Sequence, residues 1–265
     1  MRVLLVAPTA SEKFGGEAIL PVHWFRTLRG LGADVELLTH ARARQELAEL
    51  FPEDQARIHF IEDTWLHRCL DAPSRWLPRR LHEVSFAMAL DLATQRDMRR
   101  VGRRIVDERK IDLVHIPTPV SPRAPSSLQF DVPTIFGPMN GGMAYPSAFR
   151  HRDSVLTRFV VRVGRLAALG SSLLFRGKRN ADLLLVANER TRMSLPGTLR
   201  NVACESMVEN GVETGLWGSA SRTQDEPREV NTIRLVTIGR LVDCKAVDQL
   251  LHALSGLDVA QSIHL

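Results

Sequence analysis

Short apolar runs alternate along the chain with longer stretches in which apolar residues recur every three or four positions. The first pattern predicts strands covered on both faces, and the second predicts amphipathic helices. Helices are expected over 17–31, which ends at Gly32, and over 81–110, as one long helix or two abutting ones. Strands are expected over 2–7, 35–39, 58–61, 113–116, 132–136 and 183–187. This alternation is typical of an α/β fold with a Rossmann-like parallel sheet.

The last part of the chain carries a second, shorter series of the same kind. We expect residues 1–195 to form the first Rossmann-like domain and 196–231, whose second half is polar, to form a linker. A buried strand at 233–238 then leads into a helix, and another strand begins at 263–265. Such a unit cannot cover both faces of a parallel sheet by itself. We therefore expect 232–265 to be the start of a second Rossmann-like domain that this chain does not complete.

Composition and charge exclude several function classes. Hydrophobic residues make up 44% of the chain and charged residues 25%, an ordinary balance for a globular protein. No stretch reaches the roughly 18 uncharged apolar residues of a membrane-spanning helix, and the first residues show no signal-peptide cleavage site. The three cysteines lie far apart without metal-ligand spacing, which indicates reduced thiols in a cytoplasmic protein. The net charge of +5 favours anionic partners, while interspersed acids and few aromatic residues argue against nucleic acid.

A pair of glycines, Gly15 and Gly16, lies between the first predicted strand and the first predicted helix. Glycines at this place let backbone N–H groups approach an anion at the helix N-terminus. A tight strand-to-helix turn also needs glycine, so the pair alone leaves both interpretations open. It does not match the GxGxxG fingerprint of dinucleotide-binding folds.

Two further candidates lie near the ends of central strands. The segment GPMNGG follows the strand at 132–136, and its Asn140, Gly141 and Gly142 either line a ligand site or form a tight turn. His115 lies at the end of another predicted strand, at the edge where open α/β sheets bind ligands. It is either a site residue or a loop histidine whose hydrogen bonds are satisfied within the fold.

The segment IRLVTIGRLVDCKAVDQLLHAL begins with the strand at 233–238 and continues into a predicted helix. Gly239, Arg240 and Lys245 follow the strand in the order GR-x4-K. A glycine at the carboxyl end of a strand, with two cations beside it, is suited to hold a diphosphate and to neutralise it as it leaves. The segment therefore predicts a diphosphate site at the start of the second domain.

The glycine pair, the turn in VENGVETGLW at 208–217 and the GRLVxxKAVDxLL segment occur in an order that resembles the family 4 glycosyltransferases of the GT-B fold. The resemblance extends through essentially the whole chain, and the segments at 137–150 and 185–196 are similar to a bacterial subgroup of that family. It implies two Rossmann-like domains that face each other across a cleft. The first domain mainly binds the acceptor, and the second binds the nucleotide sugar.

The resemblance also implies roles for the candidate residues. Arg240 and Lys245 would contact the donor diphosphate and stabilise the departing nucleoside diphosphate, while Gly15 and Gly16 would approach it from the other domain. No metal and no cofactor would be required, and the sugar would pass with retention to a surface-polysaccharide or glycolipid acceptor. The chain contains no DxD motif, and its histidines lack metal-ligand spacing.

Two departures from the family pattern bear on activity. Many relatives place a histidine after the strand that corresponds to 132–136, where this chain has Asn140, and an asparagine cannot replace an acid or a base. The donor-binding pair of the family, E-x7-E, would fall beyond Leu265. Glu205 and Glu213 have that spacing but precede the GR-x4-K segment, so we treat them as a coincidence. The chain alone is therefore expected to bind the donor weakly and to transfer sugar slowly or not at all.

The range 155–176 carries apolar residues on one helical face and arginines on another. Such a helix either lies on an anionic membrane surface near a lipid-linked acceptor or packs on the core with a solvated basic face. A different interpretation of the whole chain is a non-catalytic subunit that pairs with a separate donor-binding chain through the exposed edge of the second sheet. A third interpretation is a nucleotide-binding protein without transfer activity.

Overall fold

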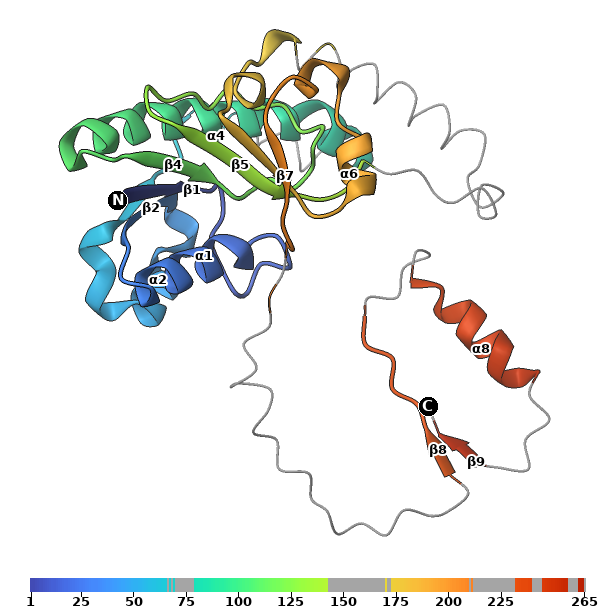
Figure 1. The fold of residues 1–265 in the computed structure, drawn as a ribbon. Coiled ribbons are helices and arrows are strands. Elements are labelled where there is room, and N and C mark those ends of the chain that lie inside the picture. Colours follow the sequence, from blue (N-terminus) through green and yellow to red (C-terminus); the bar gives the residue numbers. More distant parts are fainter. Residues whose placement is uncertain are drawn as a thin grey trace. The chain divides into compact units, whose positions relative to one another are not determined.

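The computed structural model describes residues 1–65, 67, 69, 79–142, 170, 173–209, 211, 232–239, 245–256 and 262–264. The chain forms two compact units, one over Met1–Gly211 and one over Val212–Leu265 (Figure 1). The first unit takes in residues 196–211, a stretch that the sequence predicts to be linker. This stretch contains η6 (Gly197–Leu199) and the last strand of the first sheet, which is why it packs with that unit.

The first unit is built around a sheet of seven strands in the order β3-β2-β1-β4-β5-β6-β7. The strands are β1 (Arg2–Val6), β2 (Asp34–His40), β3 (Ile58–Ile61), β4 (Leu113–Ile116), β5 (Thr134–Met139), β6 (Leu183–Val186) and β7 (Cys204–Ser206). Every neighbouring pair is parallel, which confirms the predicted Rossmann-like α/β architecture. The strand order reverses between β1 and β4, and open α/β sheets bind ligands outside the carboxyl ends of their strands at such a point.

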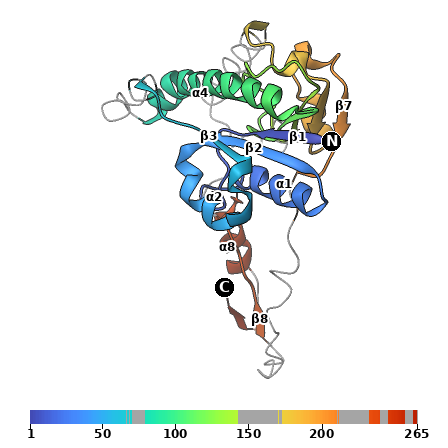
Figure 2. The ribbon, with the colours of Figure 1, turned by 90° about the vertical axis from the view of Figure 1, so that its left-hand side faces the viewer.

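Helices cover both faces of this sheet. α1 (Ile19–Gly30) and α2 (Arg44–Leu50) lie on one face, and α4 (Arg79–Arg109) crosses the other (Figures 1 and 2). α4 is a single helix of 31 residues, which decides between the two alternatives for 81–110. The unit also contains α6 (Glu189–Met193), η1 (Ala41–Ala43), η2 (Pro52–Arg57) and η5 (Lys178–Asn180). None of the helices in the described ranges combines the length and the apolar character needed to cross a bilayer.

The alternation of side chains along β1 explains why its sequence is apolar throughout. Leu4 and Val6 belong to the core cluster that includes Met98 of α4, whereas Val3 and Leu5 belong to the cluster that includes residues of α1 and α2. Successive residues therefore contribute to different cores, and burial of each such side chain stabilises the fold by about 1.5–3 kcal/mol. A pairing register shifted by one residue would exchange the two sets.

β5 differs from its prediction, which ends the strand at Phe136. The strand continues to Met139 through a register shift against β6 between these two residues. Gly137 permits this course, because its φ is +109° and a Cβ atom added there would lie 2.3 Å from the carbonyl oxygen of Leu185. The sequence pattern misses the extension because a proline, here Pro138, normally marks the end of a strand.

The second unit is a strand–helix–strand arrangement. Its elements are β8 (Thr232–Arg234), α8 (Val247–Ser255) and β9 (Ser262–His264). β8 is shorter than the predicted strand 233–238. Only three of its residues pair with the parallel neighbour β9. After β8, the side chains of Val236 and Ile238 are 82% and 93% exposed. Within the described part of this unit, these two apolar residues are left in contact with solvent.

Gly137→Ala tests the close packing of β5 against β6. We expect this substitution to lower the free energy of unfolding by more than about 3 kcal/mol, because the new methyl group would meet the Leu185 carbonyl at a φ that L residues rarely adopt. Gly16→Ala is the matched control, since no heavy atom lies within 4 Å of a Cβ added at Gly16. Urea unfolding measures both variants, and equal midpoints would contradict the account of β5.

Candidate functional site

The loop after β1 ends in the predicted glycine pair and is held by Glu46 of α2. The hydroxyl of Ser11 donates to Glu46 Oε2 over 2.6 Å, and the backbone N–H of Glu12 donates to Glu46 Oε1 over 2.7 Å. Ser11 and Glu46 are buried, so this carboxylate fixes the start of the loop. Gly15 and Gly16 are exposed, and no heavy atom lies within 4 Å of a Cβ added at either position. The loop therefore presents its backbone openly at the carboxyl edge of the sheet.

Asn140 follows β5 and joins three loops of the same edge. Its backbone N–H donates to the carbonyl of Val120 over 2.8 Å, in the loop after β4. Its side-chain amide donates to the carboxylate of Glu209, which follows β7. A ligand bound here would share the Asn140 amide with this carboxylate. The sequence pattern does not single out Glu209, because its partner lies 69 residues away along the chain.

The short helix α6 holds the two glycines that follow β5. Asn188 caps α6, because its side-chain oxygen accepts from the backbone N–H of Thr191 over 2.9 Å. The N–H of Gly141 donates to Thr191 Oγ1 over 3.3 Å, and Ser194 Oγ donates to the carbonyl of Gly141 over 2.9 Å. A Cβ atom at Gly142 would lie 2.6 Å from Ser194 Oγ, and its φ is +69°. Packing against α6 is therefore a sufficient reason for glycine at this second position.

Arg123, in the loop after β4, brings a cation to the same turn. Its Nη2 donates to the carbonyl oxygens of Gly142 and Ser194, each over 3.4 Å. The side chain is half-buried, so its charge lies at the edge of the sheet and not in bulk solvent. The sequence pattern does not single out Arg123, because one arginine among prolines has no distinctive spacing.

Lys178 of η5 supports the loop that carries Arg123. Its Nζ donates to the carbonyl of Ser121 over 2.7 Å, and the residue is buried. Burial lowers the pKa of Lys178 to about 7, and the charge of Asp91 opposes this shift. Burial also raises the pKa of the Asp91 carboxyl. A buried lysine thus holds the loop after β4 in place.

His115 lies within the sheet and not on the surface of its edge. It is 4% exposed, and its Nε2–H donates to the carbonyl of Gly137 over 2.6 Å, which fixes the tautomer. Trp24 of α1 meets the imidazole edge-on, with the ring centroids 4.5 Å apart. Burial lowers the pKa of His115 to about 4. These contacts fit the interpretation of a histidine satisfied within the fold.

In the second unit, Lys245 lies over the turn that follows β8. A Cβ atom added at Gly239 would lie 3.9 Å from Lys245 Cγ, and Lys245 is exposed. α8 begins shortly afterwards, preceded by Ala246 in a left-handed conformation with φ +52°. The structure thus brings the predicted lysine, the predicted glycine and a helix N-terminus together. Arg240 lies outside the described residues.

The predicted site residues fall into two groups, one in each unit. The first unit contains Gly15, Gly16, His115, Asn140, Gly141 and Gly142, and the second contains Gly239 and Lys245. Among the described residues, no group of three or more histidine, cysteine or carboxylate side chains could hold a metal ion. The edge of the first sheet instead offers backbone amides, a carboxylate and a guanidinium group, which suit hydroxyl-rich or anionic ligands.

Comparison with known proteins gives a loose structural likeness. No protein-family model matches the chain, and no curated protein matches it. Among solved structures, MurG from Acinetobacter baumannii is similar over 97% of this chain and 56% of that chain, with 15% sequence identity and a TM-score of 0.42. The chain thus spans about half the length of that protein. A likeness this loose supports no inference about particular residues.

The buried state of His115 predicts a pH dependence of stability. Because its folded pKa is about 4 and its ordinary value is 6.5, the unfolded chain binds a proton in this interval that the folded chain does not. The neutral His115 therefore contributes about 3 kcal/mol to the free energy of unfolding above pH 6.5, and this contribution is lost as the pH falls towards 4. Urea unfolding of the wild type and of His115→Gln at several pH values should show their stability difference shrinking over this interval. A difference that does not change with pH would contradict the assignment.

Asn188→Ala tests the cap that holds the glycine turn. Loss of the hydrogen bond to the Thr191 N–H should reduce the free energy of unfolding by about 1 kcal/mol. Asn201→Ala is the matched control, because Asn201 is exposed and the same atoms are removed. Thermal unfolding of both variants gives the comparison, and an Asn201→Ala protein that melts as low as Asn188→Ala would argue against the cap.

Proposed function

We propose that this chain is part of a GT-B glycosyltransferase that resembles family 4 and uses a nucleoside diphosphate sugar as donor. The acceptor is a saccharide or a lipid-linked saccharide of a surface polysaccharide or glycolipid. The reaction takes place on the cytoplasmic side, retains the anomeric configuration and needs no cofactor beyond the donor substrate. The order of the sequence motifs supports the family. The geometry of the Gly239 turn supports diphosphate binding, and that of the turn after β5 supports sugar binding.

The observation that carries the proposal is the position of Lys245 over the Gly239 turn, next to the N-terminus of α8. A diphosphate placed against this turn would meet an ammonium group and the positive end of the α8 dipole. Arg240 follows Gly239 directly in the sequence and would supply a second cation. One short segment therefore carries the groups that an anionic leaving group requires.

These groups would act on the bond between the anomeric carbon and the phosphate oxygen. As that bond breaks, negative charge accumulates on the departing nucleoside diphosphate. A cation that interacts more strongly with the leaving group than with the intact donor lowers the barrier, whereas equal binding of both would not. Lys245 and Arg240 would supply this charge without a metal ion.

The first unit would hold the acceptor. The Asn140–Glu209 pair offers hydrogen bonds to the hydroxyls of the acceptor sugar. The exposed backbone around Gly15 and Gly16 is instead left for the donor diphosphate, as the family resemblance implies. Asn140 would orient a sugar and would not exchange a proton with it. His115 is buried against Trp24, so we assign it a structural role beneath this edge.

Calorimetric titration with UDP and with GDP tests the diphosphate site. We expect Arg240→Ala with Lys245→Ala to weaken binding of the preferred nucleotide by about tenfold or more, because two charge-assisted hydrogen bonds to phosphate are removed. The corresponding nucleosides, which lack phosphate, should bind the wild type and the variant equally.

Arg200→Ala with Lys110→Ala is the control for this titration. Both side chains are exposed, and their removal lowers the net charge by the same amount. This control should bind the diphosphates as the wild type does. Equal affinity of the wild type and the Arg240–Lys245 variant would refute the assignment.

A further inference from the structure

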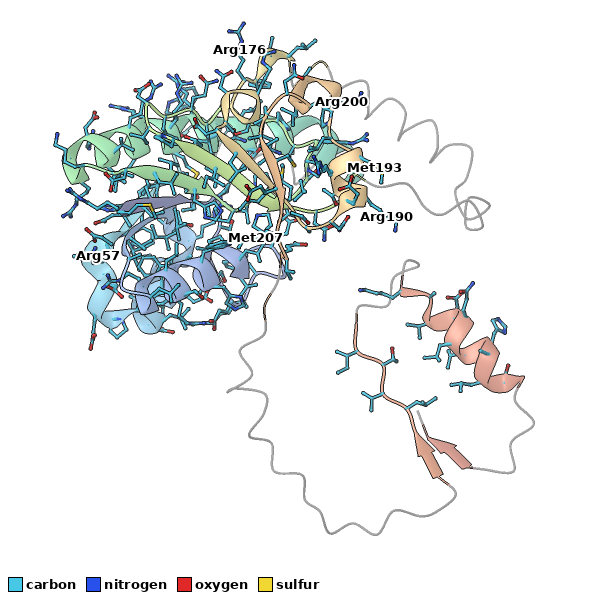
Figure 3. The ribbon with its side chains drawn as sticks, viewed as in Figure 1. Arg57, Arg176, Arg190, Met193, Arg200 and Met207 are labelled. Atoms are coloured by element: carbon cyan, nitrogen blue, oxygen red, sulfur yellow. The ribbon has the colours of Figure 1, made fainter. Side chains whose placement is uncertain are left out.

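A hollow of about 380 Å³ lies at the amino-terminal edge of the first sheet, and this volume is typical of a small-molecule site. It lies where the start of β2 meets the C-terminal end of α4, and Arg2, Glu36 and Arg109 are among the residues that line it. Figure 3 shows Arg57, which also lines the hollow, at the opposite end of the unit from Arg190 of α6. The five residues of β1 alone extend about 16 Å. The hollow is therefore separate from the turns at the carboxyl edge.

Glu36 brings a buried carboxylate into this hollow. The residue is 6% exposed, and its Oε2 accepts from His59 Nε2 over 2.7 Å. Arg57 Nη1 lies 3.8 Å and Arg109 Nε 3.9 Å from the other oxygen, Oε1, which is close enough for ion pairing but too far for a hydrogen bond. Within the described part of the chain, no donor is hydrogen-bonded to Oε1. Because buried carboxylate oxygens ordinarily accept hydrogen bonds, Oε1 is an acceptor that a ligand can use.

Two guanidinium groups of the hollow are held in place without being neutralised. Arg2 Nη1 donates to the backbone carbonyl of Arg109 over 2.7 Å, at the end of α4. Among the described residues, no carboxylate lies within hydrogen-bond distance of the side chain of Arg2 or of Arg109. Arg57 differs, because it is hydrogen-bonded to Asp34. Arg2 and Arg109 therefore keep N–H donors for an anionic group.

The hollow thus offers unused groups of both signs. Glu36 Oε1 suits an ammonium group, while the guanidinium groups of Arg2 and Arg109 suit a carboxylate. An anion without a positive charge would be repelled by Glu36, and a cation without a negative charge by the two arginines. A divalent metal ion fits less well, since no three histidine, cysteine or carboxylate ligands come together among the described residues. This chemistry favours a small ligand that carries both charges.

We propose that the hollow binds a free α-amino acid, with its ammonium group on Glu36 and its carboxylate on Arg2 and Arg109. The two charged groups of such a ligand are attached to one carbon atom, which matches the 3.9 Å between Glu36 Oε1 and Arg109 Nε. Ala56 and Ile111 also line the hollow and favour a small apolar side chain. The inference goes beyond transferase activity and does not depend on it, because all of these residues lie at the amino-terminal edge.

Thermal unfolding of the wild type with each of the twenty common L-amino acids, at about 10 mM, tests the proposal. We expect at least one amino acid with a small apolar side chain to raise the midpoint by about 3 °C, the shift for a Kd of about 1 mM. Its amide lacks the carboxylate, and its N-acetyl form lacks the ammonium group. Each blocked form should bind at least about tenfold more weakly in calorimetric titration, because one charge-assisted contact is lost.

Glu36→Gln and Arg109→Gln test the two halves of the site separately. Each should weaken binding of the free amino acid by about tenfold or more. Glu36 also accepts from His59, so its variant is checked by circular dichroism, whereas the Arg109 side chain is 51% exposed and its removal leaves the core intact. Glu49→Gln and Arg200→Gln are the matched controls, because both remove an exposed charge outside the hollow. These controls should bind the amino acid like the wild type.

Three outcomes would overturn the proposal. The first is that none of the twenty amino acids raises the unfolding midpoint. The second is that the blocked forms bind as tightly as the free amino acid. The third is that Arg109→Gln binds the amino acid as the wild type does. None of these measurements involves a nucleotide, so failure of the proposed diphosphate site would leave this test unaffected.

Discussion

Burial of the parallel sheet on both faces is the constraint that places every candidate group in the first unit. Along β1, residues such as Leu4 and Leu5 face opposite cores, so their side chains are not accessible to a ligand. Groups that could contact a ligand therefore lie at the two edges, whereas a polar residue within a strand, such as His115, is buried. At the amino-terminal edge, a hollow of about 380 Å³ is lined by charged residues, yet Arg57 there pairs with both Asp34 and Glu36. The carboxyl edge differs because its loops present exposed backbone and mixed donors and acceptors.

Glycines at the carboxyl edge serve two physical purposes. At Gly137 and Gly142, an added Cβ would meet atoms of the protein itself at 2.3 and 2.6 Å, so glycine is needed for internal packing. At Gly15 and Gly16, the same construction meets no atom within 4 Å. Space that the protein leaves empty beside an exposed backbone is space that a ligand can enter. The structure therefore distinguishes two kinds of glycine that the sequence presents alike.

The sequence predicts the local elements well and the contacts between them poorly. The ranges 58–61 and 113–116 match β3 and β4 residue for residue. A strand of a parallel sheet is buried on both faces, so it begins and ends with the apolar run that forms it. The end of β5 and the carboxylates Glu46 and Glu209 were missed. Each depends on a partner far along the chain, such as the Asn140 amide for Glu209, and no periodicity records such pairs. Propensity and pattern describe neighbours in sequence, whereas a site is assembled from neighbours in space.

Environment, more than residue type, decides what each cation of this chain can do. Arg57 and Arg44 are paired with carboxylates, so their charge is already balanced. Lys178 is buried with a pKa of about 7 and donates to a fixed carbonyl, which makes it a structural support. Lys245 and, on α4, Arg96, Arg100, Arg103 and Arg104 are exposed, and the described residues provide no carboxylate partner for them. An anion arriving from solution gains most from cations of this last kind, because no existing pair has to be broken first. The same argument favours Lys245 as a contact for the proposed diphosphate ligand.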